Sequence, residues 1–166
     1  SDYQRTRIMT FLNPSDYLLT TYAQQYNSVM AIGSGMLTGK GLNNNTLTSV
    51  KGGNFISEPQ TDFIFAVLGE ELGFVGSCIV IGLLAFIVIE CLLIARDAAD
   101  MTGRLIASGV AAIIMFQVFV NIGVATALLP NTGLPLPFVS YGLSSLLTNF
   151  VGIGLVLNVG LQRNRR

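Results

Sequence analysis

The chain has 166 residues, of which 51% are hydrophobic and only 11% are charged, and its mean hydropathy is +0.63. Nine basic and nine acidic side chains leave no net charge, and there is no histidine. Soluble domains usually contain about 25% charged residues, so this composition argues against a soluble domain and predicts a membrane protein. We expect membrane lipids, and no nucleic acid, among its partners.

Residues 1–61 are expected to form a long loop that contains one helix. Asn13-Pro14-Ser15-Asp16 supplies a helix start, and apolar side chains then recur at helical spacing. Two interpretations stay open: an amphipathic helix that lies in the membrane interface, or a helix packed on neighbouring protein. The recurring apolar residues are Leu18, Leu19, Tyr22, Tyr26, Val29 and Met30.

A glycine-rich segment follows at residues 33–41. Its spacing excludes a P-loop, because Gly33 and Gly35 are misplaced relative to Gly39-Lys40 and Gly41 stands where a hydroxyl residue is required. We therefore expect no ATP site. A glycine turn that presents Lys40 beside free backbone amides is a weaker hypothesis for binding a diphosphate.

Four carboxylates stand at the start of the first long apolar segment: Glu58, Asp62, Glu70 and Glu71. Pro59 suits the first turn of a helix, and a four-residue separation would place Glu58 and Asp62 on one helical face. Without histidine, a general base must come from another residue type, and Asp62 is the best placed. The residues leave open that Asp62 and Glu58 only cap the positive end of the helix.

The remaining sequence predicts three transmembrane helices within residues 62–166, at about 63–95, 105–129 and 138–161. Residues 105–162 carry no charge, which is too long for one span, and three prolines with a glycine divide them at residues 130–137. Arginines between spans one and two and after span three place those ends, including the C-terminus, in the cytoplasm. Residues 1–61 and the proline-rich loop are then outside. The arginines are Arg96, Arg104, Arg163, Arg165 and Arg166.

Polar residues inside the predicted spans need partners. Glu70 and Glu71 would lie two to three turns into span one, where a charge is costly unless paired. They would line a substrate groove or, as a structural alternative, hydrogen-bond to N-terminal spans of the longer protein that precede this chain. Gln117 and Asn121 are expected to bond to a neighbouring helix.

Four strings resemble, in order and spacing, the C-terminal half of the SEDS family, the FtsW/RodA/SpoVE group of bacterial proteins. They are A-I-G-S-G-M-L-T-G-K-G, E-P-Q-T-D-F-I-F-A-V-L-G-E-E-L-G-F-V-G, F-Q-V-F-V-N-I-G-V and L-P-L-P-F-V-S-Y-G-L-S-S-L. The resemblance implies an all-α, multi-pass protein of the bacterial cytoplasmic (inner) membrane with about ten spans. This chain would be a fragment of it, with a long extracytoplasmic loop and the last three helices.

The resemblance also implies an activity, an inverting glycosyltransferase that polymerises lipid II into peptidoglycan glycan strands for elongation, division or sporulation. Asp62 matches the aspartate proposed as catalytic in the T-D-F-I-F motif, and Glu58 matches the glutamate four positions earlier. Lys40 matches the lysine of the G-K-G turn, and Ser140 and Tyr141 match the S-Y-G motif. The expected substrate-binding residues are Glu58, Lys40, Arg5, Arg7, Ser140 and Tyr141. Departures from the family at residues 35–36, 56–57 and 143 remove none of these groups.

In the implied reaction Asp62 accepts a proton from the acceptor sugar, and the polyprenyl diphosphate of the donor leaves. Lys40, Arg5, Arg7 or a divalent cation, Mg or Mn, would stabilise the departing charge. The product is a polyprenyl-diphosphate-linked glycan, and a class B penicillin-binding protein transpeptidase is the expected partner. Two other functions stay open: a transporter or flippase of the lipid-linked precursor, because broken helices also mark translocation pathways, and a non-catalytic scaffold for the transpeptidase.

Overall fold

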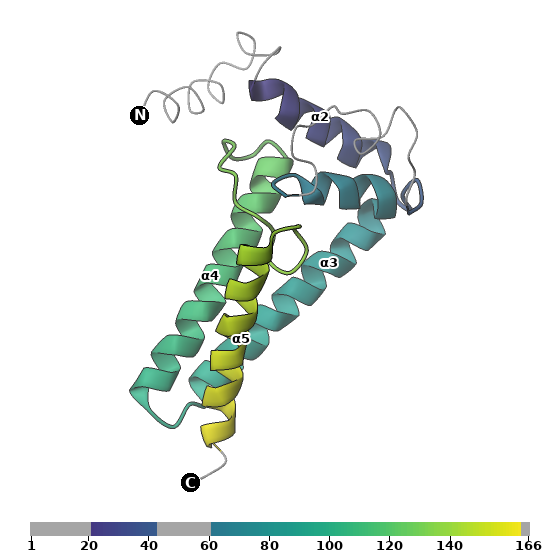
Figure 1. Ribbon diagram of the computed structural model, residues 1–166. Coiled ribbons are helices and arrows are strands. Elements are labelled where there is room, and N and C mark those ends of the chain that lie inside the picture. The colour runs from purple at the N-terminus through teal and green to yellow at the C-terminus, as the bar shows by residue number, and fades with distance from the viewer. Residues whose placement is uncertain (1–20, 43–60, 164–166) are drawn as a thin grey trace.

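The computed structural model describes residues 21–42 and 61–163 (Figure 1). In these two ranges all regular structure is helical, as the sequence predicted: α2 (Thr21–Ser34), α3 (Ile64–Arg96), α4 (Met101–Ala125) and α5 (Leu143–Arg163). The last three are long and apolar enough to cross a membrane, which confirms three long apolar helices. The helix start predicted at residues 13–16 lies outside the described residues, and the proposed membrane orientation stays a prediction.

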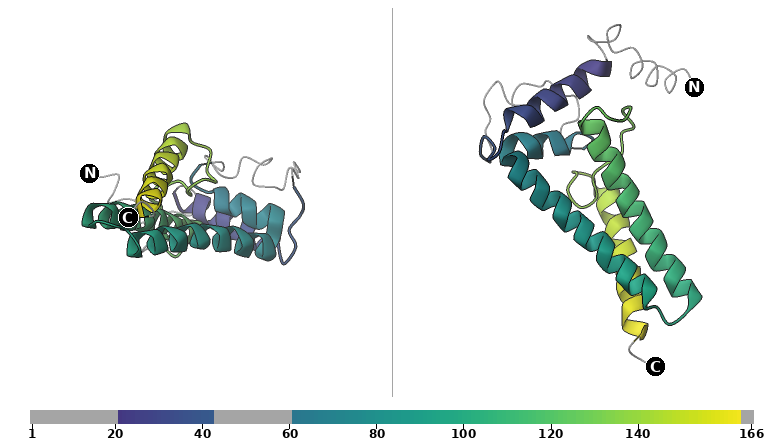
Figure 2. Two further views of the ribbon diagram at one scale, coloured as in Figure 1. Left: turned by 90° about the horizontal axis from the view of Figure 1, so that it is seen from below. Right: turned by 180° about the vertical axis from the view of Figure 1, so that it is seen from behind.

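α3 is bent at Gly73, which the sequence interpretation missed. Gly73 has φ 67° and ψ −166°, a backbone conformation that essentially only glycine adopts. Residues 64–72 run across the end of the bundle beside α2, and residues 74–96 descend along α4 (Figures 1 and 2). At 1.5 Å per residue this second segment reaches roughly 34 Å, enough to cross a bilayer. The bounds predicted for this helix, 63 to 95, agree with Ile64–Arg96, but the helix is bent and not straight.

A turn formed by the glycine-rich segment holds this bend. The backbone amides of Phe74 and Val75 donate to the carbonyl oxygens of Met36 and Leu37, at 2.8 and 3.1 Å. These bonds satisfy amides that the break at Gly73 removes from the helical hydrogen-bond ladder. The glycine-rich segment therefore stabilises a helix bend.

The turn and the first segment of α3 pack backbone against backbone. A β-carbon at Gly35 would collide with the carbonyl oxygen of Gly69, and one at Gly39 with that of Glu71. The amide of Lys40 donates to the Glu70 carbonyl oxygen at 2.9 Å, and that of Gly41 to the Glu71 carbonyl oxygen at 3.1 Å. The amides of Lys40 and Gly41 are therefore bonded to carbonyls of α3, and diphosphate binding by this turn stays a prediction.

The ends of α4 lie four residues earlier than predicted. Asp100 caps the N-terminus by accepting a hydrogen bond from the Gly103 amide at 3.2 Å. At the other end Ala127 adopts φ 57°, and Leu128 donates to the Gly123 carbonyl oxygen at 2.8 Å, as in a Schellman motif. These two local motifs set the helix at Met101–Ala125 in place of 105–129.

α5 begins later than predicted because the chain turns first. Phe138 has φ 63°, and the amide of Ser140 donates to the carbonyl oxygen of Leu136 at 3.0 Å. The helix starts at Leu143, so residues 138–142 belong to the proline-rich loop and not to the third span, which was predicted at 138–161.

Small side chains allow the three long helices to approach one another. Ala107 and Ala111 of α4 are 0% and 1% exposed, and they pack in one cluster with residues of α3 and α5. The cluster comprises Val88, Cys91, Ala95, Ala107, Ala111, Ile114 and Val156. Large apolar side chains on the outward faces, such as Phe86 and Phe119, are exposed, as expected for helices surrounded by lipid.

α2 is attached to the end of α4 through its polar residues. The Gln25 side-chain amide donates to the carbonyl oxygens of Val124 and Leu129, at 3.2 and 2.8 Å, and the Ser28 hydroxyl donates to that of Ala125 at 2.7 Å. Of the two interpretations of this helix, packing on neighbouring protein is thus what the structure has. Tyr26, Val29 and Met30 are nevertheless exposed, and contact of this apolar face with a membrane interface stays a prediction.

Candidate functional site

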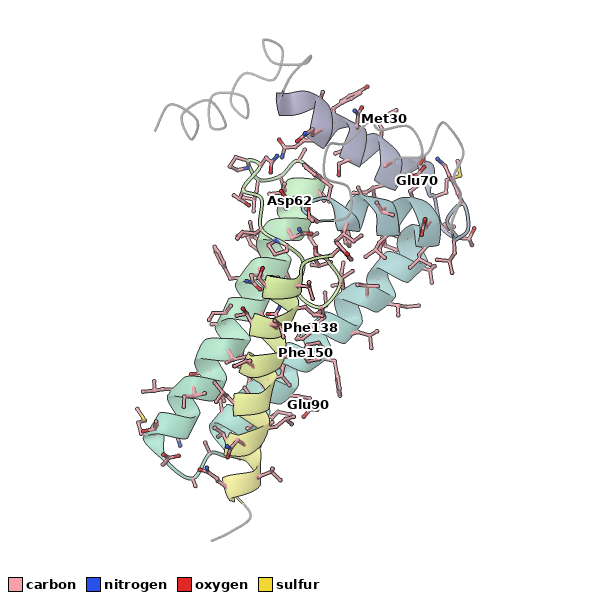
Figure 3. All side chains as sticks on the ribbon, viewed as in Figure 1. Met30, Asp62, Glu70, Glu90, Phe138 and Phe150 are labelled. Carbon is pink, nitrogen blue, oxygen red and sulfur yellow. The ribbon has the colours of Figure 1, made fainter. Side chains whose placement is uncertain are left out.

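Asp62 lies in a turn of residues 61–63 that leads into α3 (Figure 3). The N-cap residue of the helix is Phe63, whose side chain makes no capping hydrogen bond. Asp62 lies one residue before this N-cap, and the alternative in which Asp62 and Glu58 only cap the positive end of the helix stays a prediction. Glu58 lies outside the described residues, so its predicted place on one helical face with Asp62 stays a prediction.

The residue that follows Asp62, Phe63, is anchored in the hydrophobic core. Phe63 is 2% exposed and packs in a cluster with Ala31 of α2 and with Val120 and Val124 of α4. Such an anchored aromatic side chain fixes where α3 begins. Asp62 itself is half-buried, so its carboxylate is at the border between the protein and its surroundings.

Two side chains form hydrogen bonds to the backbone of residues 61 and 62. The Asn121 side-chain amide donates to the Asp62 carbonyl oxygen at 2.9 Å and to the Leu134 carbonyl oxygen at 2.7 Å. The Ser140 hydroxyl donates to the Thr61 carbonyl oxygen at 2.6 Å and accepts from the Leu136 amide at 2.7 Å. Two successive carbonyls of the turn are thus bonded to side chains that also bond the proline-rich loop.

The carboxylate of Asp62 faces this same loop. A β-carbon at Gly133 would lie 3.2 Å from the Asp62 Oδ2 atom, and Gly133 has φ +73°. Two features favour glycine at this position: its positive φ disfavours other residues, and a side chain here would press on the carboxylate. A half-buried carboxylate beside a glycine in a loop can accept a proton from a hydroxyl that enters there.

Lys40 lies elsewhere. Its Nζ atom is 2.8 Å from Oε1 of Glu70, and the two side chains are 30% and 4% exposed. Glu70 is eight residues after Asp62, at the other end of the first segment of α3 (Figure 3), which corresponds to roughly 12 Å along a helix. Glu70 and Glu71 precede the bend at Gly73, and their depth in the membrane stays a prediction. Glu70 pairs with Lys40 of the glycine-rich turn, and the bonds that the sequence predicted from Glu70 and Glu71 to preceding helices stay a prediction.

The structure therefore brings together two of the residues that the sequence singled out, Asp62 and Ser140. Tyr141 follows Ser140 in the chain and is 79% exposed. The predictions that Ser140, Tyr141 and Lys40 contact substrate stay predictions, although Ser140 and Lys40 both bond within the protein. Arg5 and Arg7, like Glu58, lie outside the described residues.

Sequence reasoning missed two contributors, Gly133 and the true partners of Asn121. Asn121 bonds to the carbonyls of a turn and a loop, and not to a neighbouring helix as predicted. One sequence signal could have indicated these partners: Asn121 is a polar residue in an uncharged span, close to the proline-rich segment that follows it. The Gln117 side-chain oxygen is buried with no hydrogen-bond partner among the described residues, and the predicted bond of this side chain to a neighbouring helix stays a prediction. In residues 21–42 and 61–163, no three His, Cys, Asp or Glu side chains gather as a metal site.

Comparison with known proteins gives relatives over nearly the whole chain. Residues 1–165 match the FtsW/RodA/SpoVE family model, described as cell cycle protein. The chain is 43% identical over 162 residues to the peptidoglycan glycosyltransferase MrdB of Escherichia coli (strain K12) and 41% identical over 157 residues to the stage V sporulation protein E of Bacillus subtilis (strain 168). These alignments cover 98% and 95% of this chain but 43% and 42% of the relatives, so the chain spans less than half of their length.

A solved structure agrees with these matches. One of its chains aligns with a TM-score of 0.72 and 32% sequence identity, covering 100% of this chain and 44% of the other. That structure is described as the structural coordination of polymerization and crosslinking by a peptidoglycan synthase complex. From the family match, the relatives and the shared fold together, we conclude that the chain belongs to the FtsW/RodA/SpoVE family of cell cycle proteins.

Proposed function

We propose that this chain is part of a peptidoglycan glycosyltransferase that polymerises lipid II at the outer face of the bacterial cytoplasmic membrane. The observation that carries the proposal is the placement of Asp62, a half-buried carboxylate held beside Gly133 at one end of three helices of membrane-spanning length. Relatives at about 40% identity have names that describe this activity. The arginine-bearing turn between α3 and α4 is at the opposite end of the bundle (Figure 1), as the proposed topology requires.

In the proposed reaction Asp62 acts as the general base. The 4-hydroxyl oxygen of the acceptor sugar bonds to the anomeric carbon of the lipid-linked donor while Asp62 takes the hydroxyl proton. The bond between that carbon and the diphosphate oxygen breaks, and its electron pair leaves with the polyprenyl diphosphate. Attack opposite the leaving group inverts the anomeric configuration.

The departing negative charge needs stabilisation from another group. Lys40 is a weaker candidate than its sequence position suggested, because its ammonium group is paired with the buried carboxylate of Glu70. Arg5, Arg7 and a divalent cation are the other proposals for this role. A penicillin-binding protein of class B is the proposed partner, in keeping with the complex in which the solved relative was described.

The decisive experiment replaces Asp62 in the full-length protein, reconstituted in proteoliposomes with lipid II. A general base contributes about 10²–10⁴-fold to a rate, so Asp62→Asn should lower glycan polymerisation by at least roughly 100-fold while insertion and thermal stability are retained. The matched control is Asp97→Asn, which removes a half-buried carboxylate paired with Arg96 at the other end of the bundle and should polymerise normally.

The same preparation separates the other two functions. Movement of the lipid-linked precursor across the bilayer without polymer would favour a transporter. The absence of both movement and polymer would favour a scaffold for the transpeptidase. Polymerisation by Asp62→Asn at a rate near that of Asp97→Asn would remove Asp62 from the role of base.

A further inference from the structure

The buried side-chain amide of Asn121 bonds to two separate segments of the chain. It is 1% exposed, on a helix face where its neighbours Val120 and Val124 are also buried. Its single side-chain nitrogen donates to two carbonyls, those of Asp62 and Leu134, which belong to segments on either side of α4 in the chain. One amide thereby links the helix, the turn that carries Asp62 and the proline-rich loop.

The orientation of this amide is fixed by its partners. Reversing it would place its oxygen against two carbonyl oxygens, so the nitrogen must face Asp62 and Leu134. The side-chain oxygen is then buried, with no hydrogen-bond partner among residues 21–42 and 61–163. A residue that served packing alone would not leave such an oxygen in a core, whereas departures from complete polar satisfaction are expected near functional sites.

Ser140 holds the residue before Asp62, Thr61, in a similar way. It is 7% exposed, and its hydroxyl bonds both the Thr61 carbonyl oxygen and the Leu136 amide. The turn before α3 is thus joined at two successive carbonyls to two points of the loop that contains Gly133. Because Gly133 lies against the Asp62 carboxylate, the same bonds set the position of the carboxylate relative to the loop.

We propose that Asn121 and Ser140 are positioning residues for the Asp62 carboxylate, acting through the backbone of residues 61–62 and the proline-rich loop. This inference rests on the proposed function, in which Asp62 must meet a hydroxyl at hydrogen-bond distance. A displacement of about 1 Å in a reacting group can lower a rate by about 100-fold. Neither residue needs to touch the substrate for this effect.

The first test compares two substitutions of buried asparagines in the full-length protein. Asn121→Leu keeps the branching and the number of side-chain heavy atoms and removes both N–H donors. Asn149→Leu is the matched control, because Asn149 is 6% exposed in α5 and its side-chain nitrogen has no partner among the described residues. Asn121→Leu should lower kcat for polymerisation by roughly 100-fold with KM unchanged. In an Asp62→Asn background it should cause no further loss, because it acts only through Asp62.

A second measurement does not depend on activity. With Cys78 and Cys91 replaced by alanine, a nitroxide label on Asp62→Cys should become more mobile when Asn121→Leu is added, and should not respond to Asn149→Leu. Ser140→Ala, which releases the other carbonyl, should act in the same direction and serves if Asn121→Leu does not fold.

The outcomes are distinguishable. The inference is overturned if Asn121→Leu and Ser140→Ala both retain the kcat of the control, or if the label at position 62 does not respond to either. If the unmodified protein makes no polymer but the label still responds, the proposed function fails and the positioning role stands.

Discussion

The bend of α3 makes a quantitative prediction about Gly73. A β-carbon there would lie against the backbone nitrogen of Gly39 and 2.7 Å from the carbonyl oxygen of Leu37, and it would have to adopt φ 67°. A non-glycine residue in this backbone region costs about 1–3 kcal/mol, and forcing one methyl group into a packed contact costs about 1–3 kcal/mol more. We therefore expect Gly73→Ala to destabilise the protein by about 2–6 kcal/mol.

The control for this prediction lies in the same helix. A β-carbon at Gly82 would meet nothing within 4 Å, and this glycine has no positive φ, so Gly82→Ala should be neutral or stabilising by up to about 1 kcal/mol. Thermal unfolding of both variants in one lipid nanodisc preparation provides the measurement. An unfolding temperature for Gly73→Ala equal to that of Gly82→Ala would mean that α3 can run straight, and the reasoning about the bend would be refuted.

Two further predictions concern the ends of the first α3 segment. Lys40→Met should leave the 4%-exposed Glu70 carboxylate without its counter-ion and destabilise by roughly 2–4 kcal/mol, somewhat less than a fully buried pair because Lys40 is partly exposed. Adding Glu70→Gln should restore most of the loss, and a double-mutant cycle by thermal unfolding measures it; additive effects would contradict the pairing. Gly133→Ala, which presses on Asp62, should reduce lipid II polymerisation at least roughly tenfold. Gly154→Ala, in open space on α5, should not, and equal rates for the two would argue against a crowded carboxylate.

Helix number and type followed from hydrophobicity because the spans are long and uncharged, a signal that needs no tertiary information. The bend in α3 could not be predicted in this way. Residues 64–96 form one apolar segment with two carboxylates near its start, and hydropathy carries no information on the backbone angle φ. The cause of the bend is a turn more than 30 residues earlier in the chain, at Met36 and Leu37. Its glycines looked like a ligand-binding loop because the sequence does not show which backbone they approach.

The proline-rich break was predicted, but its extent was not. Three prolines identify a loop, whereas the four-residue shift of α4 depends on an aspartate cap at Asp100 and on Ala127 in a left-handed conformation. The choice of Asp62 as base came from elimination and from resemblance, and it stays a prediction. Its support by Asn121 and Ser140 was hidden, because both bonds join residues 59 or more positions apart.

The bend at Gly73 also bears on how this helix enters a bilayer during biosynthesis. Insertion scales assign about 2.5–3.5 kcal/mol to an ionised side chain at the centre of a span. Because the chain changes direction immediately after Glu70 and Glu71, residues 74–96 offer the translocation machinery a segment whose first two-thirds is uncharged. We expect this segment to partition into lipid by itself, so that both glutamates remain at the headgroup level.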